Sequence, residues 1–285
     1  MASTTTRPPA AARRGQFARL FTRLGETVEL TGRQVDYWAT VYRRTWKGSV
    51  VSSFLVPFLF LLAMGVGLGG FIDDGTAQRA LGGVTYLGFI APGLLVATAM
   101  QTAVGESTYP VLGNFKWTKV YLSMVATPLG VPAVLLAHLL FVLFRLVTTC
   151  TVFLIVLALF GLVPGVAAAA GGLLVAAVVG MAYATPIFGF AAWIDSDSGF
   201  ALIFRLGVMP MFLFSGAFFP VSQLPDAVEW LAYLNPLWHG VELSRMFMVY
   251  GIDPPMALLH AGYLGVLLVG GGVWALRMFS RRLVG

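Results

Sequence analysis

The sequence predicts an all-α integral membrane protein with six transmembrane helices, an N-terminal interfacial amphipathic helix and an outer re-entrant helical hairpin. Of its 285 residues, 58% are hydrophobic and only 11% are Asp, Glu, Lys or Arg, whereas a soluble domain carries about 25% charged residues. From Val120 to Ile194, 75 consecutive residues, Arg145 is the only charged side chain. So few charges cannot cover the surface of a soluble globule, and a water-soluble fold is excluded.

Six segments are long and apolar enough to cross a bilayer, which takes about 20 residues in a helix. They run at about 49–70, 82–105, 131–160, 166–193, 199–220 and 256–276. The turn at 161–165 separates the third segment from the fourth, because its Gly and Pro residues interrupt helices. The fifth segment is the least regular, since it contains Arg205 and Pro210. These segments and their connections form one expected transmembrane domain, residues 48–278, without room for a soluble catalytic domain.

The distribution of Lys and Arg predicts the orientation, because these residues gather on the cytoplasmic side of a membrane. The first 47 residues hold nine of the 18 Lys and Arg. Six crossings from that end place Lys116, Lys119 and the basic tail 279–285 inside, and Arg79 and Arg245 outside. We therefore expect a multi-pass protein of the cell (inner or plasma) membrane with both termini cytoplasmic.

The region before the first span divides in two. Residues 1–28 have no apolar period and are expected to form a mobile, basic, cytoplasmic segment. Residues 29–47 repeat large apolar side chains, among them Trp38 and Tyr42, every three or four positions. This pattern predicts an amphipathic connecting helix on the inner leaflet. Attraction of its basic residues to anionic lipid explains the charge more simply than a nucleic-acid partner does.

Two connections are more than simple loops. The inner one, 106–129, mixes aromatic side chains with lysines, so it either rests on lipid or presents a surface to another protein. The outer one, 221–253, reads as two short helices, each opened by Pro and rich in interfacial aromatic residues. It predicts a re-entrant hairpin, which requires protein to cover its freed backbone groups.

No catalytic or metal-binding pattern is present in the sequence. A Walker A loop is absent, so the chain is not expected to hydrolyse ATP by itself. His138, His239 and His260 lack the spacing of a metal site, and Cys150, the single cysteine, is expected to pack as a small apolar residue. Ser215-Gly216 lacks the preceding glycine of a hydrolase elbow. We therefore expect a non-enzymatic chain without catalytic residues, cofactor or metal.

The third span contains the most informative polar group. His138, Arg145 and Thr148 or Thr149 lie on one helical face. Leaving an Arg in lipid costs at least about 2.5 to 3.5 kcal/mol, so Arg145 requires a partner. Two roles stay open: a structural pair with a carboxylate or carbonyl of a neighbouring helix, or the lining of a substrate pathway. A third possibility is snorkelling toward the inner headgroups.

An ordered set of segments resembles a known family. The segments are Phe-Ile-Ala-Pro-Gly-Leu-Leu at 89–95, Tyr-Leu-Ser-Met-Val-Ala-Thr-Pro-Leu at 121–129, Phe-Ser-Gly-Ala-Phe-Phe-Pro at 214–220, Leu-Pro at 224–225 and Asn-Pro-Leu-Trp-His-Gly-Val-Glu-Leu-Ser-Arg at 235–245. In their order and spacing they resemble the permease subunits of ABC type 2 exporters. Within that family, the chain is most similar to permeases for nodulation lipo-oligosaccharide export and for actinobacterial drug efflux. The resemblance covers roughly residues 30 to 280.

The resemblance implies an exporter that moves a lipid-linked glycan, a lipid or a hydrophobic drug outward. It implies a homodimer of permeases with two copies of a separate ABC ATPase, which binds ATP and Mg. Carried onto this sequence, the ATPase docking contact falls on Tyr109, Asn114, Phe115, Lys116, Trp117, Lys119 and Tyr121. The rival interpretation is an ATP-independent secondary transporter or channel, but such proteins usually show paired halves or several membrane carboxylates.

Overall fold

The computed structural model describes residues 83–285, together with positions 32, 38, 40, 42, 43, 54, 55, 58–64, 67 and 81. The predicted segment 1–28 lies outside the described residues. So do most of the predicted connecting helix 29–47, most of the first predicted span and the loop with Arg79. The fold below is that of the described residues, and it contains helices and turns but no strand.

Among the described residues, four helices are long and apolar enough to cross a membrane. They are α4 (Tyr86–Ser107), α7 (Val131–Leu159), α8 (Val166–Trp193) and α13 (Pro254–Val284). They correspond to the second, third, fourth and sixth predicted spans. The last of them continues through most of the expected tail at 279–285, so that the basic residues Arg281 and Arg282 are helical.

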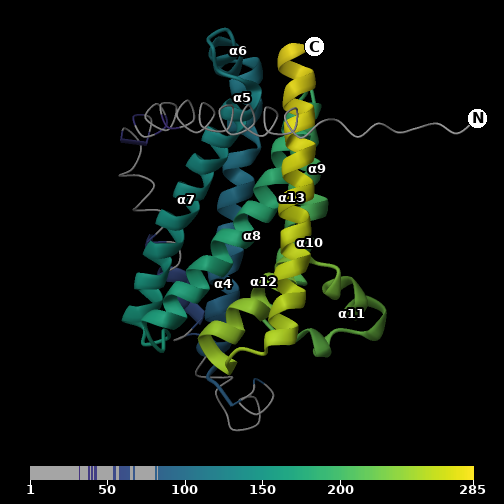
Figure 1. Ribbon diagram of the computed structural model, residues 1–285. Helices are drawn as coiled ribbons and strands as arrows, with labels where there is room; N and C mark the ends of the chain where they lie inside the picture. The colour runs from purple at the N-terminus through teal and green to yellow at the C-terminus, as the bar shows by residue number, and fades with distance from the viewer. Residues whose placement is uncertain are drawn as a thin grey trace, which may run out of the picture.

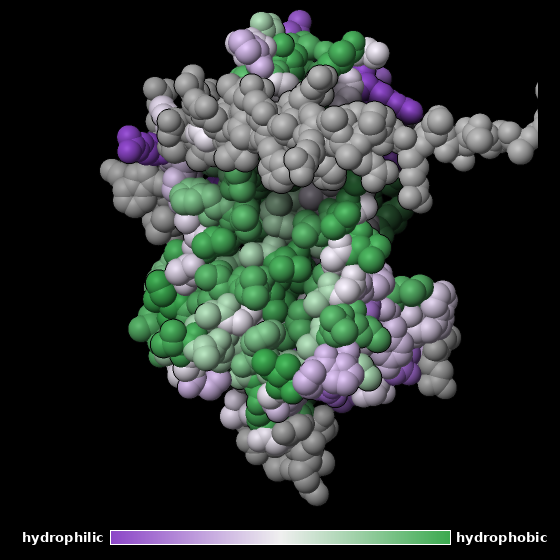
Figure 2. Space-filling model, viewed as in Figure 1, coloured by the Kyte–Doolittle hydropathy of each residue, from purple (hydrophilic) through white to green (hydrophobic). Residues whose placement is uncertain are grey.

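The four helices form a bundle in which α8 packs against α4, α7 and α13. Figure 1 shows that α6 and the C-terminus lie at one end of the bundle and that α11 and α12 lie at the other. We call these the α6 end and the α12 end. Figure 2 shows apolar side chains over the middle of the visible face, with hydrophilic ones toward both ends, as expected for a protein that sits in a bilayer.

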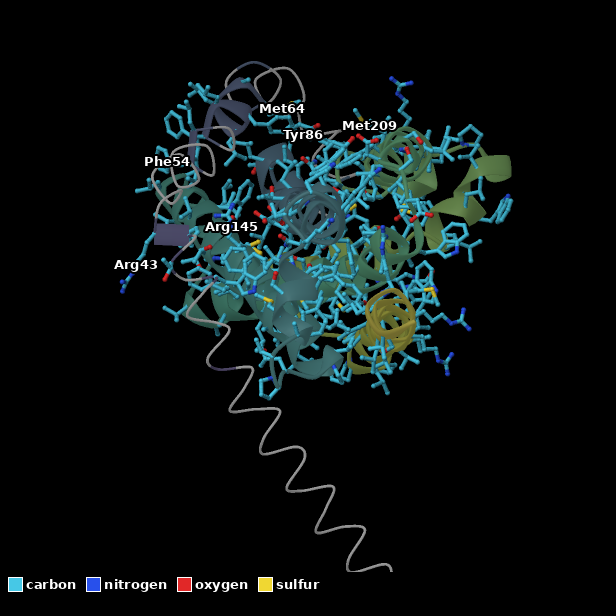
Figure 3. The ribbon with its side chains drawn as sticks, turned by 90° about the horizontal axis from the view of Figure 1, so that it is seen from above. Arg43, Phe54, Met64, Tyr86, Arg145 and Met209 are labelled. Atoms are coloured by element: carbon cyan, nitrogen blue, oxygen red, sulfur yellow. The ribbon has the colours of Figure 1, made fainter. Side chains whose placement is uncertain are left out.

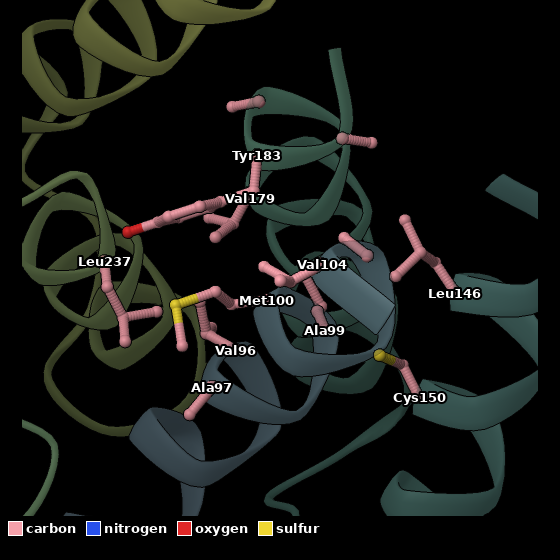
Figure 4. Packing of buried hydrophobic residues seen from close by; sticks show 14 of the residues in the cluster. Val96, Ala97, Ala99, Met100, Val104, Leu146, Cys150, Val179, Tyr183 and Leu237 are labelled. Carbon is pink, nitrogen blue, oxygen red and sulfur yellow. The ribbon is translucent and has the colours of Figure 1, made fainter. Parts of the chain in front are cut away.

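The core of the bundle is made by small and branched side chains. Figure 4 shows Val96 and Met100 of α4 facing Val179 of α8, with Leu146 and Cys150 of α7 on the other side. A Cβ placed on Gly180 of α8 would lie 2.6 Å from Leu146 Cδ1, so the helices α7 and α8 approach each other closely there. Cys150 is buried and free, and it packs as a small apolar residue.

The fifth predicted span, 199–220, is shorter than expected. It consists of α9 (Ser198–Leu202), the π-helix η2 (Ile203–Val208) and α10 (Met209–Leu213). Pro210 has no N–H to donate, and a π-helical turn before it is a known accommodation of such a defect. The helix ends at Leu213, and in the turn that follows Gly216 adopts a φ of +74°, which glycine tolerates.

The segment after the fifth span is helical, as the sequence predicts. A short 3-10 turn, η3 (Val221–Gln223), leads into α11 (Asp226–Tyr233) and α12 (Pro236–Arg245), which is followed by the π-helix η4 (Met246–Tyr250). Pro225 precedes α11, and Pro236 is the first residue of α12. Two short helices opened by prolines therefore form a hairpin at the α12 end (Figure 1).

Candidate functional site

At the α6 end, the predicted inner loop is a helical structure. Helix α4 ends at Ser107, and Thr108 turns the chain with its hydroxyl donating to Val104 O at 2.9 Å. Helices α5 (Tyr109–Lys116) and α6 (Val120–Val125) follow, separated by Lys119 at a φ of 52°. The loop therefore folds into two short helices that have an exposed face and a face buried against the bundle.

The predicted docking residues divide between these two faces. Tyr109, Lys116, Trp117 and Lys119 are exposed, and Trp117 leaves 60% of its surface open. Asn114 is half-buried and accepts a hydrogen bond from the Thr118 hydroxyl. Phe115 and Tyr121, in contrast, are buried in the core. Only the exposed residues can touch a partner directly, and the two buried ones support them from below.

The buried docking residues belong to an aromatic cluster, which we call the α6-end cluster: Trp38, Phe115, Tyr121, His138 and Phe279. The Phe115 ring lies 4.7 Å from the Tyr121 ring and 4.8 Å from the Phe279 ring, measured between centroids. Trp38 stacks on His138 at 4.0 Å. The cluster thus joins the α5–α6 element to α7, to α13 and to one residue of the predicted connecting helix.

One hydrogen bond orients this cluster. The Tyr121 hydroxyl is bonded to His138 Nδ1 in the buried interior. Burial raises the pKa of Tyr121 far above its usual range, and the weaker effect of a hydrogen bond with Asn114 does not reverse this. The hydroxyl therefore keeps its proton, and the tautomer of His138 determines which of the two groups donates in this hydrogen bond.

Arg145, the candidate of the third span, is paired with a carboxylate. Its Nε donates to Glu106 Oε1 of α4 at 2.9 Å, and the two side chains are 16% and 24% exposed. Its guanidinium also lies 5.1 Å from the centre of the Tyr42 ring. In the view from above, Arg145 lies within the outline of the helices, whereas Arg43 projects from the edge (Figure 3). Sequence reasoning expected Arg145 to need a partner but did not identify Glu106 as that partner.

The four predicted residues of the third span do not converge on one another. His138 bonds to Tyr121, and Arg145 bonds to Glu106. The Thr148 hydroxyl donates to backbone carbonyls of its own helix, and Thr149 is buried. These residues therefore act as separate contacts along α7.

At the α12 end, the structure contains a site that sequence reasoning missed. Arg245 of α12 is only 2% exposed. Its Nε donates to Phe89 O at 3.3 Å, its Nη2 donates to Gly216 O at 2.7 Å and Ala217 O at 3.5 Å, and its Nη1 pairs with Glu242 at 2.8 Å. Its guanidinium also lies 3.7 Å from the centre of the Phe89 ring. We call Phe89, Gly216, Ala217, Glu242 and Arg245 the Arg245 clamp.

The clamp joins three parts of the chain that are far apart in the sequence: α4, the turn after α10, and α12. A Cβ on Gly93 of α4 would lie 2.9 Å from both Cα and Cβ of Ala217. The turn is therefore held between a glycine on α4 and the guanidinium. Two sequence features could have indicated this site: Glu242 lies three residues before Arg245, and both belong to the 235–245 segment. The count of Lys and Arg used Arg245 only to predict which side of the membrane its segment faces.

Two histidines fasten the hairpin to α13. His239 Nε2 lies 3.0 Å from Tyr233 O, which can only accept, so this nitrogen carries a proton. In the neutral ring His239 Nδ1 then accepts from His260 Nδ1, 2.8 Å away. The Tyr263 hydroxyl of α13 also donates to Leu234 O at 2.7 Å. Within the described part of the chain, no group of three or more His, Cys, Asp or Glu is arranged to hold a metal ion.

Comparison with known proteins identifies a family and several relatives. Residues 36–249 match the family described as ABC-2 type transporter. The chain is 29% identical to Nodulation protein J of Rhizobium leguminosarum bv. viciae over 256 residues, which cover 87% of this chain and 95% of that protein. It is also 29% identical to Nodulation protein J of Sinorhizobium fredii over 258 residues, 87% of this chain and 94% of that protein.

Proposed function

Because the chain belongs to the ABC-2 type transporter family, we propose that it is the transmembrane permease subunit of an ATP-binding-cassette exporter. The protein is a multi-pass membrane protein. In the proposed complex it moves a lipid-linked glycan, a lipid or a hydrophobic drug outward. A separate ATPase subunit binds ATP and Mg and hydrolyses the ATP. The observation that carries the proposal is the family match across residues 36–249, from the predicted connecting helix into η4.

The proposed complex contains two copies of this permease and two of the ATPase. Its α6 end faces the cytoplasm with both termini, and its α12 end faces outward in the cell membrane. The charge distribution supports this orientation, since Lys116 and Lys119 lie at the α6 end. The exposed face made by Tyr109, Lys116, Trp117 and Lys119 is the proposed ATPase contact.

The fold supports a mechanical route from this face into the bundle. Phe115 and Tyr121 lie directly beneath the exposed residues and pack on Phe279 and His138. A movement of α5 and α6 is therefore transmitted to α7 and α13 through packed rings. Arg145 and Glu106 act in this proposal as a structural pair between α4 and α7, since each already has the other as its partner.

Nucleotide-dependent transport is the direct test. The permease is co-purified with an ABC ATPase subunit and reconstituted in vesicles, and transport is measured with ATP, with no nucleotide and with a hydrolysis-deficient ATPase. Transport that requires ATP hydrolysis is the expected result. Equal transport under all three conditions would favour an ATP-independent secondary transporter.

The docking face has its own test. Trp117→Ala should weaken co-purification of the ATPase while the melting temperature of the permease stays unchanged, because Trp117 is mostly exposed. Trp230→Ala is the matched control, since Trp230 is 56% exposed on α11. Unchanged ATPase binding and unchanged coupling in Trp117→Ala would remove this face from the proposal.

A further inference from the structure

A cavity of about 250 Å³ lies at the α12 end, between α4 and the hairpin. Six residues of its lining matter here: Phe89, Tyr233, Trp238, Glu242, Arg245 and Tyr250. Pockets that enclose drug-sized ligands measure about 300 to 1,000 Å³. This cavity is slightly smaller, so it is matched to one ring-sized group and not to a whole amphiphilic molecule.

The charges in the cavity balance each other. Arg245 and Glu242 form an ion pair at 2.8 Å, and the carbonyls of Phe89, Gly216 and Ala217 accept the other hydrogen bonds of the guanidinium. Glu242 accepts this bond on one carboxylate oxygen, and its side chain remains 29% exposed. A charged ligand would have to compete with one member of a pair that is largely buried, which is unfavourable. The cavity therefore favours a neutral ligand with hydroxyl groups that can donate to the carboxylate.

Aromatic rings supply much of the remaining lining, together with Leu81, Pro220 and Val221. The Tyr233 and Trp238 rings meet edge to face with centroids 4.8 Å apart, and Tyr250 is 49% exposed. Burial is the main cause that raises the pKa of Tyr250, so its hydroxyl remains a donor. A ligand for this cavity thus needs apolar C–H faces for the rings as well as hydroxyl groups at its edge.

A sugar ring combines these properties, because its C–H groups form apolar faces and its hydroxyls project around the rim. We propose that the cavity binds one neutral sugar ring, with the ring packed on Trp238, Tyr233 or Tyr250 and a hydroxyl donating to Glu242. This inference rests on the proposed function and narrows its substrate to a glycan-bearing amphiphile, whose sugar is held at the outer hairpin. A phosphate-bearing headgroup fits less well, because it would bring an anion beside Glu242.

Binding of a soluble sugar tests the cavity without transport. The full-length permease is placed in phosphatidylcholine nanodiscs, and cellobiose binding is followed by saturation-transfer NMR. Tyr250→Leu removes a ring outside the clamp, and Glu242→Gln removes the carboxylate while keeping an acceptor for Arg245. Each should weaken binding about five- to tenfold, equivalent to about 1 to 1.4 kcal/mol. Trp230→Leu, on the same hairpin but outside the cavity, should bind as the wild type does.

Several outcomes would overturn the proposal. They are no cellobiose binding by the wild type, equal binding by all four proteins, or displacement of the sugar by phosphocholine or inorganic phosphate. The melting temperature of each variant is measured alongside, and if Glu242→Gln does not fold, Tyr250→Leu decides alone. ATP-driven transport without sugar binding would support the proposed exporter function and reject the sugar site. Sugar binding without nucleotide-dependent transport would support the sugar site and reject the proposed exporter function.

Discussion

The α5–α6 element at one end of the bundle and the hairpin at the other are anchored by different kinds of contact. The α5–α6 element rests mainly on packed aromatic rings, with the tyrosine–histidine hydrogen bond among them. Arg282, which is 22% exposed, lies over the Phe115 ring and donates to the carbonyls of Ala191, Ala192 and Ile194. At the α12 end, one buried guanidinium is bonded to three carbonyls and a carboxylate. Ring packing changes gradually as surfaces slide, whereas a set of directional bonds to one group is made or lost together.

The difference between packed rings and directional bonds indicates which movements each end can tolerate. A surface that must follow a moving partner requires contacts that tolerate small displacements, and the α6-end cluster has them. A hairpin that must keep one position requires directional bonds that break together and not one by one. The Arg245 clamp has such bonds, because they all depend on one guanidinium. We therefore expect the loss of Arg245 to destabilise the fold sharply, whereas substitutions in the α6-end cluster should have effects graded by how much packed ring surface they remove.

The largest expected effect comes from removing the centre of the clamp. Arg245→Met keeps the length of the side chain but leaves Glu242 and the carbonyls of Gly216 and Ala217 without their donor. Breaking a buried pair typically costs about 3 to 5 kcal/mol, so the free energy of unfolding in detergent should fall by that amount. Arg277→Met, at an exposed arginine of α13, is the control. A wild-type melting temperature for Arg245→Met would show that the clamp does not hold the hairpin.

The second prediction tests the other side of the same turn. Gly93→Ala places a methyl group about 2.9 Å from backbone and side-chain atoms of Ala217, and overpacking of this kind costs about 1 to 3 kcal/mol. Gly105→Ala on the same helix meets nothing within 4 Å and should be neutral or stabilising by up to about 1 kcal/mol. Thermal unfolding of both variants gives the comparison. Equal stability of the two would mean that the turn does not press on α4.

Sequence reasoning located the regular parts of the fold well. Helix α8 has the predicted bounds, 166–193, because a Gly- and Pro-containing turn before it and two aspartates after it mark its ends. The fifth span was predicted seven residues too long at its end, because the apolar residues of the turn at 214–220 look like those of a span. Their role depends on the φ of Gly216 and on contacts with α4, which hydropathy does not encode.

The sites were harder to predict, because their contacts also join residues that are far apart in the sequence. The burial of Phe115 and Tyr121 depends on Phe279, more than 150 residues later in the chain. The pairing of Arg145 with Glu106 depends on the packing of α7 against α4. Composition identified Arg145 as a group that needs a partner, but it did not identify the partner, and it placed Arg245 in the outer hairpin without recognising its buried contacts. Local pattern thus predicts which residues require contacts, and the tertiary fold determines where those contacts are found.

The third prediction concerns the Arg145–Glu106 pair, whose expected contribution to stability is smaller than that of the Arg245 clamp and larger than that of the Tyr121–His138 hydrogen bond. Because the two side chains are 16% and 24% exposed, its loss should cost about 1 to 2 kcal/mol, more than a surface pair and less than a fully buried one. Arg145→Gln, Glu106→Gln and the double variant form a cycle, measured by unfolding and by transport. A structural pair predicts that the double variant is no less stable than either single one. Additive stability losses, or loss of transport at wild-type stability in Arg145→Gln alone, would favour a role in the substrate pathway.

The smallest expected effect is at the α6-end cluster, where one hydrogen bond can be removed with little change in shape. Tyr121→Phe keeps the ring that packs on Phe115 and Phe279 but removes the hydroxyl bonded to His138. Hydrogen bonds between side chains in membrane proteins average about 0.6 kcal/mol, so the fold should lose about that much. Tyr121→Ala also removes the packed ring and should cost about 3 to 5 kcal/mol. If packing carries the motion of the α5–α6 element, Tyr121→Phe should keep ATP-coupled transport near the wild-type rate. Loss of coupling in Tyr121→Phe at near wild-type stability would instead mean that the hydrogen bond to His138 carries the motion, and the contrast between the two ends would no longer hold.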